Sequence, residues 1–543
     1  MDMEEEPLEL GPNTEFLQAL HLSPDIHDKD VRGILMPMIL SAIYDDNPVL
    51  SLDKIWIAVE DNDGHTYLDP LDVLGHLIAC PRQGADDFMY FLGAHFSPKE
   101  VILAMQEYVE RMKIGFHEDN AEENQLAPAA QLANVALVYN VSIFRLVLKK
   151  KSPYETIFPL LSELTSVVNL VGGRAAKVDG RNLIREISNL ASSTHRWVVR
   201  SSNKHPEDIQ NTNDLLGKLI DTSIQSCASC IQSSLAARSF EAHFPRLVVT
   251  SYVSPDWNNG QAVIFSAMKI LVILGIEPEI IWNPPTISNL VYLAHSPHPL
   301  ADPLQLLNKI LPVLISSLQM NVALDECLYL LLDCLTRMSA AVDLPDEVVI
   351  PLCDTLPALA SGHPDAFIRH ITFRLLSLVL ALSSPPLRLQ ILRELTSELS
   401  PPQMRASAIG LVKEAMMEAL GSPAAKGANI FASPLLLQAF GPILFRTSPP
   451  YFFSSIHSLD DIRESLEPAR LVECLSLYYV LLQRDTENKT GVRDRDQISS
   501  VKSSLLKPLS LFLEQNERTV VQLIALRVSL DRVDDALEKI EKS

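Results

Sequence analysis

The sequence predicts an all-α fold, an irregular HEAT/armadillo-like helical-repeat solenoid, and three observations indicate it. Apolar residues recur at spacings of three and four along most of the chain, whereas strict alternation of apolar and polar residues is nearly absent. Glycine is scarce, at 19 of 543 residues, while proline is frequent, at 36, which suits helices separated by proline breaks. The helices expected between 301 and 421 also form successive pairs of similar length.

Those pairs give the strongest repeat signal in the chain. Their first helices begin about 42 residues apart, within the range of two-helix HEAT or armadillo units. Such units cannot bury their apolar faces alone, so neighbouring units must stack. The helices of the three pairs are expected at 302–319 and 321–340, at 344–360 and 364–382, and at 385–399 and 402–420.

The spacing of the helices upstream is less regular. The clearest start lies in FSPKEV, where Ser97 can cap a helix, Pro98 fits its first position and Glu100 completes a capping box. The same pattern precedes the last helix of the third pair, at Ser400-Pro401-Pro402. The upstream helices are expected at 28–46, 69–80, 97–115, 126–150, 153–171, 179–199, 207–240 and 260–275.

Polar stretches without helical periodicity divide the chain into regions. SSNKHPEDIQNTND and RDTENKTGVRDRDQ are the strongest candidates for a boundary or an exposed loop. The predicted organisation is an N-terminal helical region 1–200, a polar linker or loop 201–214, central helices 215–300, HEAT-like helix pairs 301–421, and a C-terminal helical region 430–543 with an exposed loop 484–497.

The C-terminal segment carries a short apolar seam. Its spacing alternates between three and four over fewer than three heptads, too few to predict a coiled coil. We interpret the segment as the last helix of the array, with a partner-binding helix as the alternative. The seam consists of Leu523, Leu526, Leu530, Val533, Leu537 and Ile540.

The charge balance and the distribution of apolar residues indicate which kinds of partner and which compartment to expect. A formal net charge of −22 disfavours direct nucleic-acid binding, and the one basic run is Lys149-Lys150-Lys151. The N-terminus, MDMEEEPLELGPN, is acidic where a secretory signal would be basic and then apolar. No uncharged, proline-free run of membrane-spanning length is evident. We therefore expect a cytoplasmic or nucleocytoplasmic protein that binds a protein partner and no membrane.

Seven cysteines in a chain of this length indicate no disulfide framework. Cys227 and Cys230 form a single CxxC inside a long helical pattern, and no second pair completes a zinc site. Two interpretations remain open, buried packing residues and redox-sensitive thiols.

The sequence lacks the motifs of the common enzyme classes. It has no GxxxxGK[ST] loop, no GxGxxG after a strand, no GxSxG elbow and no HExxH. The histidines show no ligand spacing, and His295 and His298 fall in a proline-broken stretch that is expected at the surface. We therefore predict no catalytic, cofactor-binding or metal-binding residues, and a protein that is not an enzyme.

Two segments resemble a known family. The segment FRLLSLVLALSSPPLRLQILRELTSELSPPQMRASAIGLVKEAM ends in an Ile-x-Leu-hydrophobic-Lys-Glu pattern, and FSPKEVILAMQEYVERM carries Lys99 and Glu100. Both resemble segments shared by glomulin, the plant aberrant lateral root formation protein and the fungal Yap-binding proteins. The pattern residues are Ile409, Leu411, Val412, Lys413 and Glu414.

The resemblance implies an all-helical, HEAT-like protein without catalytic activity. Glomulin-type members occlude the RING subunit of cullin-RING ubiquitin ligases. Fungal members bind a Yap-type bZIP transcription factor in the oxidative-stress response or associate with kinetochores. An enzyme on a helical scaffold, with an unrecognised site, is the remaining alternative.

The best-matched segment also supplies the candidate contact residues. Its polar positions can contact a partner, or they can form salt bridges between the repeats. These candidate partner-binding residues are Arg369, Arg374, Arg405, Lys413 and Glu414.

Overall fold

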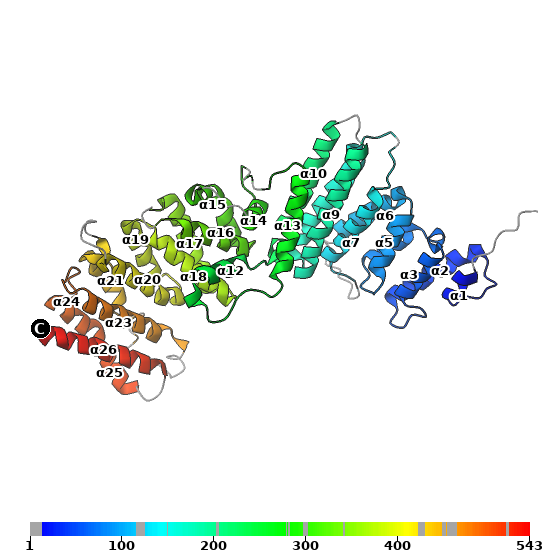
Figure 1. Ribbon diagram of the computed structural model, residues 1–543. Coiled ribbons are helices and arrows are strands. Elements are labelled where there is room, and N and C mark those ends of the chain that lie inside the picture. Colours follow the sequence, from blue (N-terminus) through cyan, green and yellow to red (C-terminus); the bar gives the residue numbers. More distant parts are fainter. Residues whose placement is uncertain are drawn as a thin grey trace, which may run out of the picture. The chain divides into compact units, whose positions relative to one another are not determined.

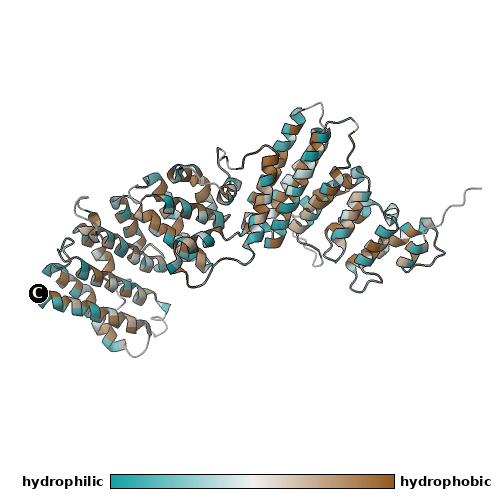
Figure 2. Cartoon of the chain, in the orientation of Figure 1, coloured by the Kyte–Doolittle hydropathy of each residue, from teal (hydrophilic) through white to brown (hydrophobic). Residues whose placement is uncertain are grey.

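A computed structural model shows a chain built from helices (Figure 1). In the residues it describes, every regular element is an α-helix, a 3-10 helix or a π-helix, which confirms the all-α prediction. The described residues are 14–115, 125–148, 150–201, 206–278, 280, 283–296, 302–339, 343–421, 429–447, 452, 464–516 and 521–542. Within this part of the chain the helices carry teal and brown faces, the pattern of amphipathic helices (Figure 2).

The chain divides into two compact units. The first comprises Met1–Glu241, Arg246–Pro299 and Met320–Leu330, and the second comprises Ala242–Pro245, Leu300–Gln319 and Leu331–Ser543. The N-terminal region and the central helices of the predicted organisation thus lie in the first unit. The division falls inside a single helix, α16 (Leu324–Arg337), whose first half belongs to the first unit.

The first unit stacks its helices in two rows. One row shows side by side from blue to green in Figure 1, and each of its helices packs on the next. This row consists of α3 (Leu52–Asp61), α5 (Ala85–His95), α7 (Pro128–Ile143), α9 (Lys177–Ser201) and α13 (Trp257–Ile273).

The second row covers the first, and pairs such as α9 and α10 join the rows as in HEAT units. The short helices α1 (Thr14–Ala19), α11 (Ala228–Ile231) and α12 (Leu235–His243) lie outside both rows. The second row consists of α2 (Asp28–Tyr44), α4 (Pro70–Ile78), α6 (Pro98–Gly115), α8 (Pro153–Val171), α10 (Pro206–Ser226) and α14 (Ile287–His295).

Local sequence explains where these helices begin. Before α8, the Ser152 hydroxyl accepts from the Glu155 N–H at 3.2 Å and the Glu155 carboxylate accepts from the Ser152 N–H at 3.1 Å. This capping box satisfies two N–H groups that the helix leaves unpaired, and Pro153 supplies a preset φ at the first position. The predicted start of α6 at Pro98 is confirmed.

The second unit is also built from packed helices. In it α17 packs on α18, α19 on α20, and α20, α23 and α26 form a row. Its helices are α15 (Pro303–Met320), the second half of α16, α17 (Asp346–Gly362), α18 (Ala366–Ala381), α19 (Pro385–Thr396), α20 (Pro402–Gly421), α21 (Leu435–Leu444), α23 (Glu467–Arg484), α24 (Arg495–Val501), α25 (Lys507–Asn516) and α26 (Val521–Lys542).

The helices predicted for the HEAT-like pairs lie close to their predicted positions, and packing within a pair is seen for α17 with α18 and for α19 with α20. The first helices of the pairs begin at Pro303, Asp346 and Pro385, next to the predicted 302, 344 and 385. The C-terminal seam is buried as well, with Leu523, Leu526 and Leu530 at 0%, 1% and 2% exposure. α26 packs on α23 and α25 through this face, as expected for the last helix of the array.

Two predicted loops are corrected by the structure. Most of the polar linker 201–214 is helical, because α10 begins at Pro206 and its acidic first turn suits a helix N-terminus. The stretch 484–497 contains a loop between α23 and α24, but this loop is ordered and partly buried. The carboxylate of Asp485 (1% exposed) accepts from the Lys489 and Thr490 N–H groups at 2.8 Å each.

Two local expectations also change. The helix expected over 207–240 is broken after Ser226 and again at Gln232, where φ is +46°. Ser400 does not lead into α20 as a cap: its hydroxyl donates to the Glu394 carbonyl at 2.9 Å and closes the end of α19.

One described stretch, Pro153–Arg174, is long and apolar enough to span a membrane by length and composition. The sequence analysis did not identify it. It contains α8, which packs against α6 and α10 through buried residues such as Leu161 and Leu164. These contacts are those of a core helix in the first unit.

Candidate functional site

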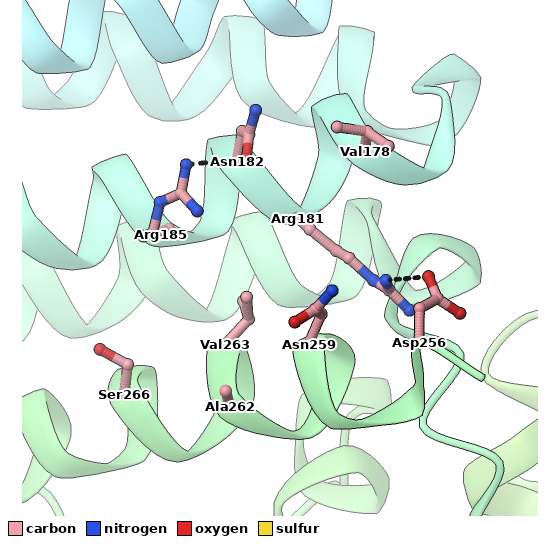
Figure 3. A pocket seen from close by; sticks show the side chains of 9 residues that line it. All are labelled: Val178, Arg181, Asn182, Arg185, Asp256, Asn259, Ala262, Val263 and Ser266. Atoms are coloured by element: carbon pink, nitrogen blue, oxygen red, sulfur yellow. Dashed lines mark hydrogen bonds and ion pairs between the residues drawn. The ribbon is translucent and has the colours of Figure 1, made fainter. Parts of the chain in front are cut away.

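One hollow of the first unit lies between α9 and α13 (Figure 3). It has a volume of about 380 Å³ and opens between the first turns of the two helices. α9 contributes Arg181 and Arg185, and the α13 side contributes Asp256 and Asn259. The remaining lining residues are Val178, Asn182, Ala262, Val263 and Ser266.

Arg181 organises one wall of this hollow. Its Nε donates to the carbonyls of Cys230 and Ile231 at 3.0 and 3.1 Å, and its Nη2 donates to Ile231 at 2.7 Å. These carbonyls end the short helix α11, where no further turn can pair them. The side chain is only 8% exposed, so the guanidinium acts as a cap supplied by another helix.

Close backbone packing places α11 beside Arg181. A Cβ on Gly260 would lie 2.0 Å from the Ile231 carbonyl oxygen, and one on Gly180 would lie 2.5 Å from the Cys230 sulfur. Only glycine fits at either position without a shift of the backbone or of the thiol. The two glycines therefore set the approach of α9 and α13 to α11.

Asp256 is the charged partner on the opposite wall. It accepts from Lys177 Nζ and Arg181 Nη1 at 2.8 Å each, and from the Ser254 hydroxyl at 2.6 Å. The hydrogen bonds from Lys177, Ser254 and Arg181 hold the pKa of Asp256 well below its usual range. Its carboxylate is therefore ionised at any physiological pH.

The lining groups determine what this hollow can do. Its titratable side chains are two arginines and the permanently ionised Asp256, so none of them changes charge near neutral pH. Such groups can hydrogen-bond a ligand, but they do not exchange protons in a general acid–base step. No local motif connects Arg181 with Asp256, 75 residues away, and the sequence analysis missed both.

The structure buries both residues of the CxxC. Cys227 and Cys230 are 0% and 2% exposed, and the Cys230 thiol contacts the Ala175 carbonyl at 3.3 Å. Burial raises the pKa of Cys227 to about 12 and also raises that of Cys230. The thiolate is the reactive form of cysteine, so this geometry favours packing over redox reactivity.

One of the predicted contact residues, Glu414, connects α20 with α18, and a second, Arg374, lies beside this link on α18. The Ser377 hydroxyl on α18 donates to the Glu414 carboxylate on α20 at 3.0 Å. Arg374 lies one turn away from Ser377, with Nη1 3.4 Å from its hydroxyl, and its guanidinium stacks 4.8 Å from the Phe244 ring centroid. Glu414 thus takes part in a link between helices of the second unit.

The other three predicted contact residues are more dispersed. Lys413 reaches from α20 to α23, with its Nζ 3.3 Å from the Ser476 hydroxyl and 3.7 Å from the Glu473 carboxylate. Arg369 donates to the His363 and Pro364 carbonyls at the turn into α18. Arg405 lines a separate hollow near the start of α20.

A buried polar cluster lies where α12, α14 and α16 meet in the first unit. Asp325 accepts from the Leu235 and Ala236 N–H groups at 2.9 Å each, so a carboxylate of α16 caps the start of α12. Burial, reinforced by the charge of Glu326, raises the pKa of Asp325.

His295 belongs to this cluster, although it was expected at the surface. Its side chain is fully buried as the last residue of α14, and its Nε2 lies 3.5 Å from the Glu326 carboxylate. The ring also meets Phe265 edge-on, with centroids 6.2 Å apart. His298 lies outside the described residues. Among the described side chains, no group of three or more His, Cys, Asp or Glu residues could hold a metal ion.

Comparison with known proteins identifies one matching region. Residues 291–534 match the model of an uncharacterised protein family described as YAP/Alf4/glomulin. No curated protein matches the chain. The matched residues include the HEAT-like pairs and the row formed by α20, α23 and α26. The match confirms the resemblance of the segment that ends at Glu414, which lies inside 291–534, to the YAP/Alf4/glomulin family, whereas the segment that carries Lys99 and Glu100 lies outside the matched residues.

Proposed function

We propose that the chain is a non-enzymatic protein-binding adaptor or inhibitor that acts by covering a partner's docking surface. The observation that carries this proposal is the family match over 291–534, which supports a helical, protein-binding role in general. Stacked helix pairs supply an extended surface for another protein without any need for a reaction centre. The hollow between α9 and α13 offers hydrogen-bonding groups such as Arg181 and Asn259 that could contact a partner.

The specific partner that we propose is the RING subunit of a cullin-RING ubiquitin ligase. A chain that covers the RING surface would block docking of the ubiquitin-conjugating enzyme, so it would inhibit chain formation without any chemistry of its own. This activity would take place in the cytoplasm or the nucleus. We expect the purified chain to capture a cullin–RING complex and to displace a labelled conjugating enzyme from it.

Ubiquitin chain formation measured against increasing concentrations of the purified chain tests this proposal. Inhibition should saturate, and the concentration at half-inhibition should rise with the concentration of conjugating enzyme, because the two compete for one surface. Undiminished chain formation at saturating protein would overturn it.

Lys413 allows a contact role to be separated from a structural role. We expect Lys413→Gln to lower the melting temperature slightly and to leave inhibition intact, because Lys413 links α20 to α23 through Ser476 and Glu473. Reduced inhibition with unchanged melting would instead assign Lys413 to the partner surface.

A Yap-type bZIP transcription factor is the second candidate partner. The net charge of −22 favours it, since the basic region of such a factor would be attracted to an acidic array. Binding should then weaken steeply with added salt, which fluorescence anisotropy with a labelled factor would measure. For a role in oxidative stress, survival in peroxide should fall when Cys227 and Cys230 are both replaced by serine. Unchanged survival would count against a thiol role.

A further inference from the structure

An arginine-lined hollow in the second unit is a candidate binding site that the proposed function does not explain. The hollow has a volume of about 150 Å³ and lies where the end of α19, the start of α20, the end of α21 and α23 meet. Its charged lining consists of Arg405, Arg446, Arg470 and Glu398. Because Arg470 is paired with Glu467, the guanidinium groups of Arg405 and Arg446 and the Glu398 carboxylate supply the remaining charge of the lining.

Arg470 forms the fixed floor of the hollow. It is 3% exposed and makes a two-pronged ion pair with Glu467, with N–O distances of 2.7 Å on both prongs. Its Nη2 also donates to the backbone carbonyl of Arg446 at 2.6 Å. Arg470 is therefore neutralised by its own partner, and it holds the backbone from which the Arg446 side chain projects.

Arg446 is the exchangeable side chain of the site. Its side chain is 49% exposed, and its Nη2 lies 3.3 Å from the carboxylate of Glu398, whose side chain is 53% exposed. An ion pair this open to solvent contributes little to stability, so its carboxylate can be replaced at little cost. An incoming oxyanion could take the position of Glu398, because the planar fork of an arginine binds carboxylate and phosphate groups through two parallel hydrogen bonds.

The turn beside the hollow presents an apolar side chain. Leu399 follows Glu398 and is 97% exposed. The turn is held by the Ser397 and Ser400 hydroxyls, which donate to the Glu394 carbonyl at 2.7 and 2.9 Å. The turn therefore exposes an apolar side chain one residue after the carboxylate that lines the hollow, and a peptide segment, unlike a free ion, can contact both.

We propose that this hollow receives the carboxylate or phosphate group of an acidic segment of the partner protein, with Arg405 and Arg446 as its ligands and Leu399 as the adjoining apolar contact. The proposal rests on the protein-binding function proposed above and names the chemistry of one contact. The volume admits one oxyanion group and not a folded element, so the group must be carried on an extended segment or a turn. Glu398 occupies Arg446 until that segment binds.

Fluorescence anisotropy with the full chain tests the proposal with three labelled peptides of equal length. One peptide carries glutamates beside a leucine, the second carries a phosphoserine in place of the central glutamate, and the third carries glutamines only. We expect the first or the second peptide to bind and the third to fail, and the better ligand identifies the source of the oxyanion. Inorganic phosphate in excess should compete with either one. Binding of neither anionic peptide would overturn the proposal.

Single substitutions then locate the bound group. We expect Arg446→Gln and Arg405→Gln each to weaken binding about tenfold or more, the range for a lost charge-assisted contact. Glu398→Gln should strengthen binding several-fold, because it removes the competing carboxylate. Glu398→Gln tests the site even if an arginine variant fails to fold, because unchanged or weaker binding by this variant would contradict the proposal.

Arg393→Gln is the matched control, since Arg393 is an exposed arginine on the same helix, α19, and does not line the hollow. It removes the same charge and should leave binding unchanged. Equal weakening by Arg393→Gln would show general electrostatic attraction and overturn the site.

The peptide-binding experiment and the ligase-inhibition experiment can fail independently of each other. A wild-type chain that inhibits the ligase but binds no anionic peptide would overturn this site and keep the function. A chain that binds the peptide through Arg446 but does not inhibit the ligase would keep the site and overturn the RING subunit as the partner.

Discussion

At the residue scale, the buried carboxylates are the features with the clearest measurable consequences. Asp221 on α10 accepts from the Tyr292 hydroxyl on α14 at 2.6 Å. Burial raises the pKa of Asp221 to about 6, in spite of the hydrogen bonds from Tyr292 and Ser288, which lower it. A carboxyl whose folded pKa exceeds its unfolded value binds a proton more tightly in the folded chain.

This sign fixes the pH dependence that Asp221 contributes. The contribution of Asp221 to the free energy of unfolding is largest below about pH 4 and decreases as the pH rises to about 6. Above that pH the contribution no longer changes. Asp221→Asn keeps an oxygen for Tyr292 and removes the titration. The stability of the variant relative to the wild type should therefore rise between pH 4 and pH 6.5, by up to about 3 kcal/mol. Chemical unfolding at four pH values measures it, and parallel stability curves would contradict the assignment.

The cysteines give a second prediction at this scale. All seven are buried free thiols, and burial raises the pKa of Cys227, Cys334, Cys353 and Cys474 to about 12. We expect almost no rapid reaction with a thiol reagent in the native chain and reaction of all seven in denaturant. A thiol titration with and without guanidinium makes the comparison. Rapid native reaction at Cys227 or Cys230 would favour the redox interpretation instead.

At the element scale, α26 provides a matched pair of side chains. Leu526 is 1% exposed in the seam that packs on α23 and α25, whereas Ile524, two residues earlier, is 56% exposed. Leu526→Ala should lower the free energy of unfolding by about 2–5 kcal/mol, because it leaves a cavity in a packed interface. Ile524→Ala should change it by less than about 0.5 kcal/mol. Equal effects of the two changes, measured by chemical unfolding, would contradict the packing of α26.

The helices that the sequence predicted well are those whose signals are local. The periodicity and proline breaks around 302–420 placed all six helices of the three pairs within a few residues. α3 carries the same kind of signal in Leu52, Ile55 and Val59, but in fewer than three turns, so it was missed. The predicted helix 207–240 was wrong for a different reason. Its break at Gln232 is held by Arg181, about 50 residues away, and no local rule encodes that contact.

The candidate sites were less predictable than the fold because each combines distant residues. Arg181 lies on α9 and Asp256 just before α13, while Arg405 lies on α20, Arg446 after the end of α21 and Arg470 on α23. The polar positions chosen from the family-like segment include Lys413 and Glu414, which link neighbouring helices. A periodic pattern shows that a polar residue lies outside the core, but not which helix it meets.

At the scale of the whole molecule, the family region and the compact units do not coincide. The match begins at residue 291, inside α14 and inside the first unit. A chain cut at 291 loses the capping box of α14, in which the Thr286 hydroxyl accepts from the Asn289 N–H at 3.3 Å. It also loses α12, whose Leu235 and Ala236 N–H groups satisfy Asp325.

The first half of α16 should therefore depend on chain that precedes the family region. Without α12, the carboxylate of Asp325 loses both hydrogen bonds that offset its burial, and burying such a group unsatisfied is costly. We expect a fragment 291–543 to exchange the amide hydrogens of 324–330 much faster than the full chain does, whereas a fragment 233–543, which restores α12, should protect them. Hydrogen exchange read by mass spectrometry compares the three chains. Equal protection in both fragments would show that the family region folds without α12, and it would remove the structural role assigned here to Asp325.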